Sequence, residues 1–145
     1  MIRKKNIFFL VLNRDDNTFC PDYIKRVSDY LDVVAQAQDE RVLVTLGTGQ
    51  KIFSTGFNLK YWLAHPLNPS YCASLFVEML GKLITLPVAT MCIMNGHAYA
   101  GGFHLSLCHD YRVMHSTAKI CLTELAIGLP MPGAFHVLLD ELLPI

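Results

Sequence analysis

Short apolar runs of strand length alternate along this chain with longer segments in which apolar residues recur at helical spacing. Between the runs Ile7 to Leu12 and Val42 to Leu46 lies a segment from Pro21 to about Gln38 whose first turn suits a helix. The apolar residues at the spacing of one helix face are Ile24, Val27, Leu31 and Val34. A strand, a helix and a strand form a βαβ unit, so we expect Val42 to Leu46 to lie in a parallel sheet and to be buried on both faces.

The same alternation continues through the rest of the chain. A second helix is predicted from Ser70 to Leu86, because apolar residues recur there at helical spacing and Pro87 ends it before a strand from Val88 to Met94. The remaining predicted elements are a helix over 103–108, strands over 111–114 and 119–122, and a helix over 134–143. The sequence has no internal repeat and no linker, so residues 1–145 are predicted to form one α/β domain.

Charge and composition narrow the class of ligand. The 12 basic and 12 acidic side chains balance, so no net field would attract nucleic acid or an anionic membrane, and a small-molecule site is the better expectation. Polar residues interrupt the apolar second half of the chain, so no membrane insertion is predicted. The 5 cysteines have no C-x-x-C spacing and mostly sit among apolar residues, as buried thiols of an intracellular protein do.

Two glycine-containing segments follow predicted strands. Residues 53–59 read FSTGFNL, and residues 95–103 read NGHAYAGGF. Glycine lets a ligand approach the backbone closely, and a helix that begins at Gly101 would point free N–H groups at an anion. Two such turns facing each other would hold an oxyanion. Most glycine turns are only turns, so neither segment establishes a site alone, and the sequence contains no phosphate-loop or dinucleotide-binding motif.

Four motifs, in this order, resemble those of the crotonase superfamily of enoyl-CoA hydratases and isomerases. They are F-S-x-G-x-[DN]-L at 53–59, a P-x-[VIA]-A strand leading to N-G-x-A-x-[AG]-G-G over 87–102, C-x-D-Y at 108–111, and [ST]-E-x-x-[IL]-G-[LI]-P at 123–130. The resemblance implies a ββα spiral of two nearly perpendicular sheets. It also implies further C-terminal helices that trimerise the subunits and help to cover CoA. Residues 1–145 are therefore expected to be the N-terminal part of a crotonase-like domain, truncated at its C-terminus, with a homotrimer or hexamer as the full-length state.

The resemblance also implies which residues form the site. The N–H groups of Ser54 and Gly101 would form an oxyanion hole, and the carboxylate of Glu124 would move a proton. The segment that holds the adenine and pantetheine of coenzyme A would include Ile52, Ser54, Asn58 and Leu59. Because CoA would arrive as part of a fatty acyl-CoA thioester, no separate cofactor and no metal is expected.

One position separates the activities within this family. The hydratases carry two glutamates, and this chain has His104 where the first would stand and Glu124 at the second. A single carboxylate suits the isomerisation of 3-enoyl-CoA to 2-enoyl-CoA in fatty-acid β-oxidation, because one base can take a proton from C2 and return it at C4. We therefore predict an enoyl-CoA delta isomerase.

Several alternatives stay open from the sequence. The chain could be a catalytically degenerate acyl-CoA-binding or scaffolding relative, or an enoyl-CoA hydratase. Glu124 could be a carboxylate bonded only to a backbone amide. His104 lies among apolar residues and is predicted to be a satisfied, partly buried histidine rather than a general base. The compartment, whether peroxisome, mitochondrion or cytoplasm, is not distinguished.

Overall fold

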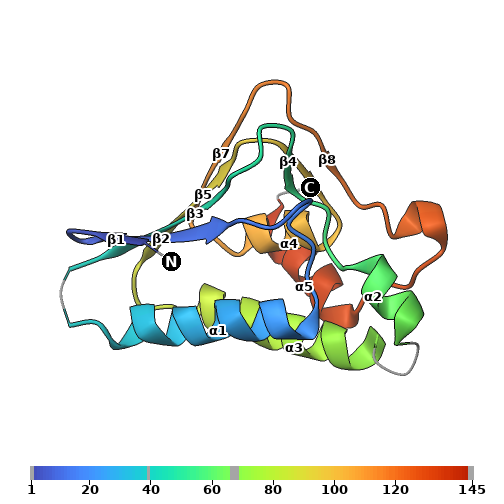
Figure 1. The fold of residues 1–145 in the computed structure, drawn as a ribbon, viewed down its shortest axis with the longest axis horizontal. Helices are drawn as coiled ribbons and strands as arrows, with labels where there is room; N and C mark the ends of the chain where they lie inside the picture. The colour runs from blue at the N-terminus through green and yellow to red at the C-terminus, as the bar shows by residue number, and fades with distance from the viewer. Residues whose placement is uncertain (1, 39, 66–68, 144–145) are drawn as a thin grey trace.

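Two sheets form the framework of the protein. A computed structural model describes residues 2–38, 40–65 and 69–143. The larger sheet has the strand order β1-β2-β3-β5-β7, with the bounds Ile2–Lys4, Ile7–Leu12, Val42–Gly47, Ala89–Met94 and Tyr111–Met114. The smaller sheet has the order β4-β6-β8, with the bounds Ile52–Ser54, His97–Tyr99 and Ile120–Cys121. All pairs are parallel except β1 with β2, and Figure 1 shows the chain passing between the sheets at their shared apex.

Two long helices lie side by side beneath the larger sheet. They are α1 (Pro21–Gln36) and α3 (Pro69–Ile84), and Lys82 of α3 forms a salt bridge of 2.8 Å with Asp32 of α1. Figure 1 shows both along one side of the strands. The other helices are α2 (Leu59–Ala64), α4 (Gly101–Leu107), α5 (Gly133–Leu142) and a 3-10 turn, η1 (Leu125–Ile127). None of the helices that the described residues form is long and apolar enough to cross a membrane.

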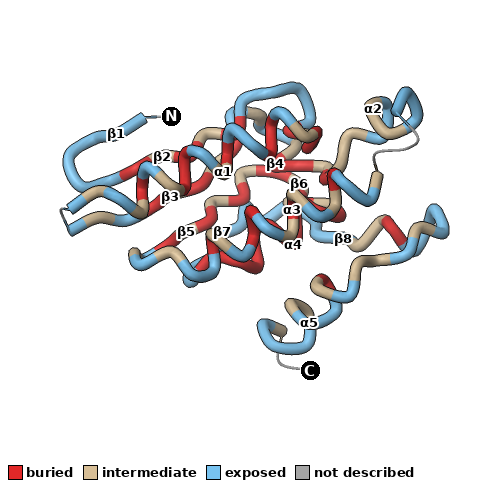
Figure 2. Tube along the Cα trace, turned by 90° about the horizontal axis from the view of Figure 1, so that it is seen from below, coloured by how far each residue is buried: buried red, intermediate tan, exposed pale blue. Residues whose placement is uncertain are grey.

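The core lies between the helices and one face of the larger sheet. On β2, for example, Phe8, Leu10 and Leu12 are buried and belong to the same apolar cluster as the buried residues of α1 and α3. Figure 2 shows buried residues along the inner strands β2, β3 and β5 and throughout α4, which is buried along its whole length. A seven-residue helix that is buried throughout must be held by its neighbours, so the start of α4 is fixed by packing on every side.

The predicted elements agree with the structure wherever a segment is long and periodic. The strand Ile7–Leu12 has the predicted bounds, and α1 ends two residues before the predicted Gln38. The expectation that β3 is buried on both faces is wrong. Its residues alternate, with Leu43 and Thr45 buried and Val42 exposed, because the core lies against only one of its faces.

The smaller sheet brings the two glycine-containing segments together. β4 pairs with β6 in parallel, with Ser54 opposite Ala98, and α4 begins immediately after β6. Backbone of the first segment lies so close to Gly102 that a Cβ added there would meet Ser54 O at 2.5 Å. The structure therefore places residues 53–59 directly beside the start of α4.

Candidate active site

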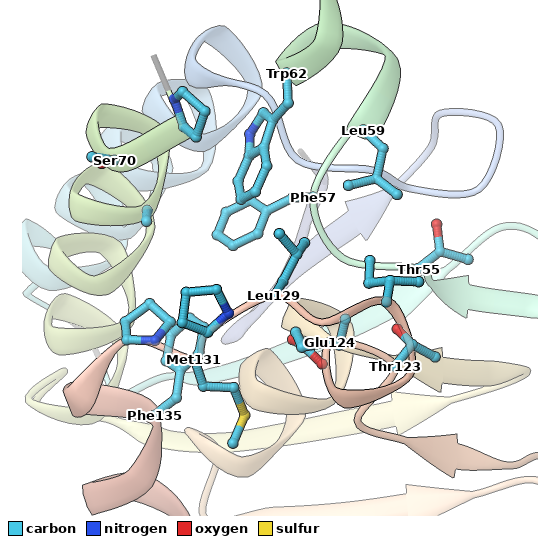
Figure 3. Close-up of a pocket in the computed structure, with 16 residues that line it drawn as sticks. Thr55, Phe57, Leu59, Trp62, Ser70, Thr123, Glu124, Leu129, Met131 and Phe135 are labelled. Carbon is cyan, nitrogen blue, oxygen red and sulfur yellow. The ribbon is translucent and has the colours of Figure 1, made fainter. Parts of the chain in front are cut away.

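A cavity of about 430 Å³ opens beside these two segments. Its walls come from α2, the first residues of α3, Ala100 and the stretch from Thr123 to Phe135 (Figure 3). Phe57 and Trp62 stack on one side with ring centroids 4.8 Å apart, and Phe135 lies on the opposite side (Figure 3). Of the described residues that line the cavity, Glu124 alone has an ionisable side chain, and most of the others are apolar.

Glu124 presents an unpaired carboxylate to this cavity. The residue is 9% exposed, and within the described part of the chain neither carboxylate oxygen has a hydrogen-bond partner. Its backbone carbonyl accepts the N–H of Leu129 at 3.0 Å, which fixes the turn that carries the side chain. No hydrogen bond of normal geometry among the described residues therefore supports the alternative that the carboxylate is bonded to a backbone amide.

Burial controls the acidity of Glu124. The loss of water around the charged form raises the pKa of its carboxyl group above the ordinary value. Its own backbone N–H lowers the pKa by a smaller amount, although it makes no hydrogen bond of normal geometry to the carboxylate. A carboxylate with a raised pKa in an apolar cavity is a stronger base than one in water.

Gly101 lies at the place where the two segments meet. It is the first residue of α4, so its N–H has no acceptor within the helix. A Cβ added at Gly56 would lie 2.7 Å from Gly101 N, which shows how closely the two turns approach. Gly56 has a φ of +83°, a conformation that glycine adopts without strain. Ala100, the residue before Gly101, lines the cavity, whereas Gly101 itself is buried and adjoins the lining through Ala100.

Ser54, predicted as the second amide donor, does not border the cavity. It lies in β4, is fully buried, and its hydroxyl donates to Asn17 O at 2.9 Å and accepts the N–H of Gly56 at 3.2 Å. Phe57, in contrast, lines the cavity. Its neighbour Asn58 donates to Phe19 O at 2.9 Å, whereas the Phe57 N–H has no acceptor among the residues that the structure describes.

The other residues predicted to hold CoA differ in their positions. Leu59 lines the cavity. Asn58 caps α2, since its side-chain oxygen accepts the N–H of Tyr61 at 2.9 Å. Ile52 pairs with His97 in the smaller sheet and does not line the cavity. The segment therefore borders the cavity at its second half, from Thr55 onward.

His104 is more deeply buried than predicted. It has no exposed surface, its Nδ1 lies 3.0 Å from Ala100 O, and its Nε2 has no partner in the described chain. Its ring stacks on Phe135 with centroids 4.0 Å apart. Burial lowers the pKa of His104 to about 4, so the imidazole is neutral near pH 7. One ring nitrogen of His104 therefore has a hydrogen-bond partner, and the other has none in the part of the chain that the structure describes. The residue does not line the cavity.

Sequence reasoning missed the aromatic wall of the cavity. Trp62 and Phe135 lie in segments whose apolar residues have no special spacing, so nothing in the sequence distinguished them from core residues. Phe57 could have been identified from the sequence, because it follows the glycine of the first motif. Among the described residues, no group of three or more His, Cys, Asp or Glu side chains could hold a metal ion.

Comparison with known proteins places this geometry among CoA enzymes. The family model described as enoyl-CoA hydratase/isomerase matches residues 3–142. Enoyl-CoA delta isomerase 3 of Arabidopsis thaliana is 33% identical over 94% of the chain, and so is the peroxisomal enoyl-CoA delta isomerase 2 of that plant. The chain spans 60% of the length of each. The crystal structure of an enoyl-CoA hydratase from Bacillus anthracis has a TM-score of 0.83 and 26% identity, covering 89% of this chain and 51% of that one.

Proposed function

Since the chain belongs to the enoyl-CoA hydratase/isomerase family and has the crotonase fold, we propose that it moves the double bond of a 3-enoyl-CoA to give the 2-enoyl-CoA. The substrate would be a fatty acyl-CoA thioester of β-oxidation, and coenzyme A would be part of the substrate rather than a separate cofactor. Two relatives at 33% identity are named enoyl-CoA delta isomerases, which supports this choice within the family. The observation that carries the proposal is the single unpaired carboxylate of Glu124 in an apolar cavity.

In the proposed reaction, Glu124 acts as the one proton carrier. Its carboxylate takes a proton from C2, and the electrons of that C–H bond delocalise into a dienolate whose negative charge lies on the thioester oxygen. The same carboxyl group then returns the proton at C4, so the double bond moves from C3 to C2 and the enzyme recovers its carboxylate. No other reactant is consumed.

Backbone amides would stabilise the dienolate. We assign the Gly101 N–H to one position of the oxyanion hole, as the resemblance implies. We move the other position from Ser54 to Phe57, because Phe57 lines the cavity and its N–H has no acceptor among the described residues. Two fixed donors in a site without water stabilise an oxyanion strongly, and losing one typically costs about 2.7–4 kcal/mol. That stabilisation would allow a carboxylate to remove a weakly acidic proton.

The cavity favours isomerisation over hydration. Addition of water needs one group to activate the water and another to protonate carbon. Glu124 is the sole acidic group among the described lining residues, and His104 is neutral and lies outside the lining. An enoyl-CoA hydratase remains the second candidate, because a structure of that name shares the fold at 26% identity.

The degenerate, binding-only alternative is less well supported. A buried carboxylate without a partner destabilises a folded protein, and a protein that only binds CoA esters would gain nothing from it. The experiment that separates the three candidates measures both reactions in one preparation. Absorbance would follow formation of 2-enoyl-CoA from 3-enoyl-CoA, and loss of 2-enoyl-CoA on hydration. We expect isomerisation to be faster; faster hydration would establish a hydratase, and binding without either reaction would establish the degenerate relative.

We propose a homotrimer or hexamer for the whole protein, to be measured by light scattering, and an intracellular location. Two relatives from Arabidopsis thaliana are named peroxisomal, which makes the peroxisome the first compartment to examine by imaging a tagged protein.

A further inference from the structure

We propose that His104 is a positioning residue that acts through the backbone. Its Nδ1–H holds the carbonyl of the Ala100–Gly101 peptide, and this contact keeps the N–H of the same peptide aimed at the reacting oxygen and strengthens it as a donor. The inference rests on the proposed function, because it takes the Gly101 N–H as an oxyanion-hole donor.

The Ala100–Gly101 peptide follows a residue with an unfavourable conformation. Ala100 has a φ of 50° and a ψ of −127°, a region of the backbone map that residues with a Cβ rarely adopt. Such a conformation persists only where the surroundings hold it, and it occurs most often at functional sites. The Ala100 N–H is already held, since it donates to Cys121 O at 2.9 Å. The next peptide therefore needs its own restraint.

Three donors converge on the Ala100 carbonyl. The backbone N–H groups of Phe103 and His104 donate to it at 2.9 and 3.2 Å, and Nδ1 of His104 lies 3.0 Å from it. The two backbone contacts belong to the first turn of α4 and would form with many sequences. The third contact depends on the side chain at position 104. His104 therefore adds a restraint that a leucine in this buried turn would not supply.

The geometry of the peptide bond transmits this restraint to the cavity. The carbonyl and the N–H of one peptide lie in a common plane and point in opposite directions. A donor that fixes the Ala100 C=O therefore fixes the direction of the Gly101 N–H. A hydrogen bond to the oxygen also polarises the amide and makes its N–H a better donor.

The surroundings of His104 keep its donor in place. The ring stacks on Phe135, which also lines the cavity. Burial and the nearby His136 both disfavour a second proton on the imidazole. The single proton of the neutral ring must lie on Nδ1, because the atom it faces is a carbonyl oxygen, which can only accept. Nε2 has no partner among the described residues. Hydrogen bonding within the core therefore does not by itself account for a histidine at this buried position.

Matched variants separate positioning from packing. In His104→Asn the side-chain amide nitrogen can occupy the place of Nδ1, whereas in His104→Gln it reaches toward the place of Nε2. His104→Leu fills similar space without a donor. The measurements are kcat and KM for 3-enoyl-CoA, the ¹⁵N and ¹H shifts of the Gly101 amide, and the infrared carbonyl stretch of bound 2-enoyl-CoA.

We expect His104→Leu and His104→Gln to lower kcat roughly tenfold with KM changed less than about twofold, a smaller effect than the loss of a whole oxyanion donor. The Gly101 amide signal should move upfield, and the carbonyl stretch should return toward its value in water. His104→Asn should restore all three readouts to near the parent values. If the leucine variant does not fold, the asparagine and glutamine pair carries the same comparison.

Equal losses in His104→Asn and His104→Gln, or an unchanged Gly101 signal and carbonyl stretch in His104→Leu, would overturn the proposal. Its failure can be told apart from failure of the proposed function. A parent that binds 2-enoyl-CoA but does not isomerise 3-enoyl-CoA would reject the isomerase. The amide shift and the carbonyl stretch would still test the role of His104.

Discussion

Glu124 combines two properties that a core residue avoids, because it carries an ionisable group and that group has no hydrogen-bond partner within the described residues. Its raised pKa follows chiefly from burial. The same environment that makes the carboxylate a better base also makes its charged form costly to the fold. Activity and stability should therefore respond to Glu124 in opposite directions.

The first consequence concerns turnover. Glu124→Gln keeps the shape of the side chain and removes the base, so isomerase turnover should fall by about 10²–10⁴-fold. Affinity for a saturated acyl-CoA, measured by calorimetry, should change little. Glu78→Gln on the exposed face of α3 is the matched control and should leave turnover unaltered. Turnover within a few-fold of the parent in Glu124→Gln would remove this residue from the mechanism.

The second consequence concerns stability. Because the folded protein raises the pKa of Glu124, its contribution to stability is fully present below the ordinary glutamate value of 4.5 and is lost as the pH rises through the raised pKa. Glu124→Gln should therefore have a higher free energy of unfolding than the parent at pH 8, and the difference should shrink as the pH falls toward 4. Urea denaturation at both pH values measures this. An equal difference at the two values would contradict the argument.

The sequence predicted which segments form the site, but it did not predict which backbone amides of those segments are open. The motif at 53–59 lies beside the cavity, but which of its amides is open depends on the hydrogen bonds that the neighbours make. The Asn17 carbonyl accepts the hydroxyl of Ser54, and the Phe19 carbonyl accepts the N–H of Asn58. No pattern in the sequence indicates these two contacts. The positive φ of Ala100 could not be predicted from the sequence either, because alanine gives no local sign of that conformation.

At the scale of elements, the two long helices were predicted most clearly. α1 and α3 have 16 residues each, and their periodicity revealed both of them. β4 and β6 have 3 residues each and are stabilised by pairing with each other and with β8, so local sequence carried no signal for them. α2 was also missed, because its 6 residues depend on the Asn58 cap and show no buried face. These short elements are the ones that bring the two halves of the site together.

Gly56 is the residue at which this junction can be tested. A Cβ there would lie 2.7 Å from Gly101 N and 2.9 Å from the Ala100 Cβ, and the φ of +83° would add strain. Gly56→Ala should push the two turns apart, lowering the free energy of unfolding by roughly 1–3 kcal/mol and abolishing most of the turnover.

The matched control is Gly81→Ala in α3. A Cβ at Gly81 meets nothing within 4 Å, so this substitution should stabilise the protein by up to about 1 kcal/mol. Thermal unfolding and the isomerase assay would be run on both variants. Similar behaviour of the two alanine variants would rule out close contact between the turns as the cause.

At the scale of the whole molecule, buried histidines make the fold sensitive to acid. His109 joins the end of α4 to the larger sheet, with Nδ1 2.9 Å from Leu105 O and Nε2 2.8 Å from the hydroxyl of Thr45. Burial lowers the pKa values of both His104 and His109 to about 4. Each neutral ring is part of the packed structure, so a proton on either one must be accommodated by unfolding or rearrangement.

The sign of the pH effect follows from linkage. A folded pKa below the unfolded value of 6.5 gives stability that is present above pH 6.5 and lost as the pH falls toward 4. The free energy of unfolding should therefore drop between these values, by up to about 3 kcal/mol for each histidine. His109→Gln should reduce the slope, whereas His115→Gln, at an exposed position, should not. A parent whose stability is flat from pH 6.5 to 4 would refute this.

The order of strands within each sheet has a consequence for synthesis. In the larger sheet β1, β2, β3, β5 and β7 follow one another in chain order, and so do β4, β6 and β8 in the smaller one. A nascent chain leaving the ribosome can therefore add each strand to one that has already emerged, and no strand has to insert between two partners that are already paired. At every stage of translation each sheet has two open edges, its newest strand and its first strand, β1 or β4. The first strand keeps the same place as the sheet grows, so only the edge at the newest strand moves along the chain.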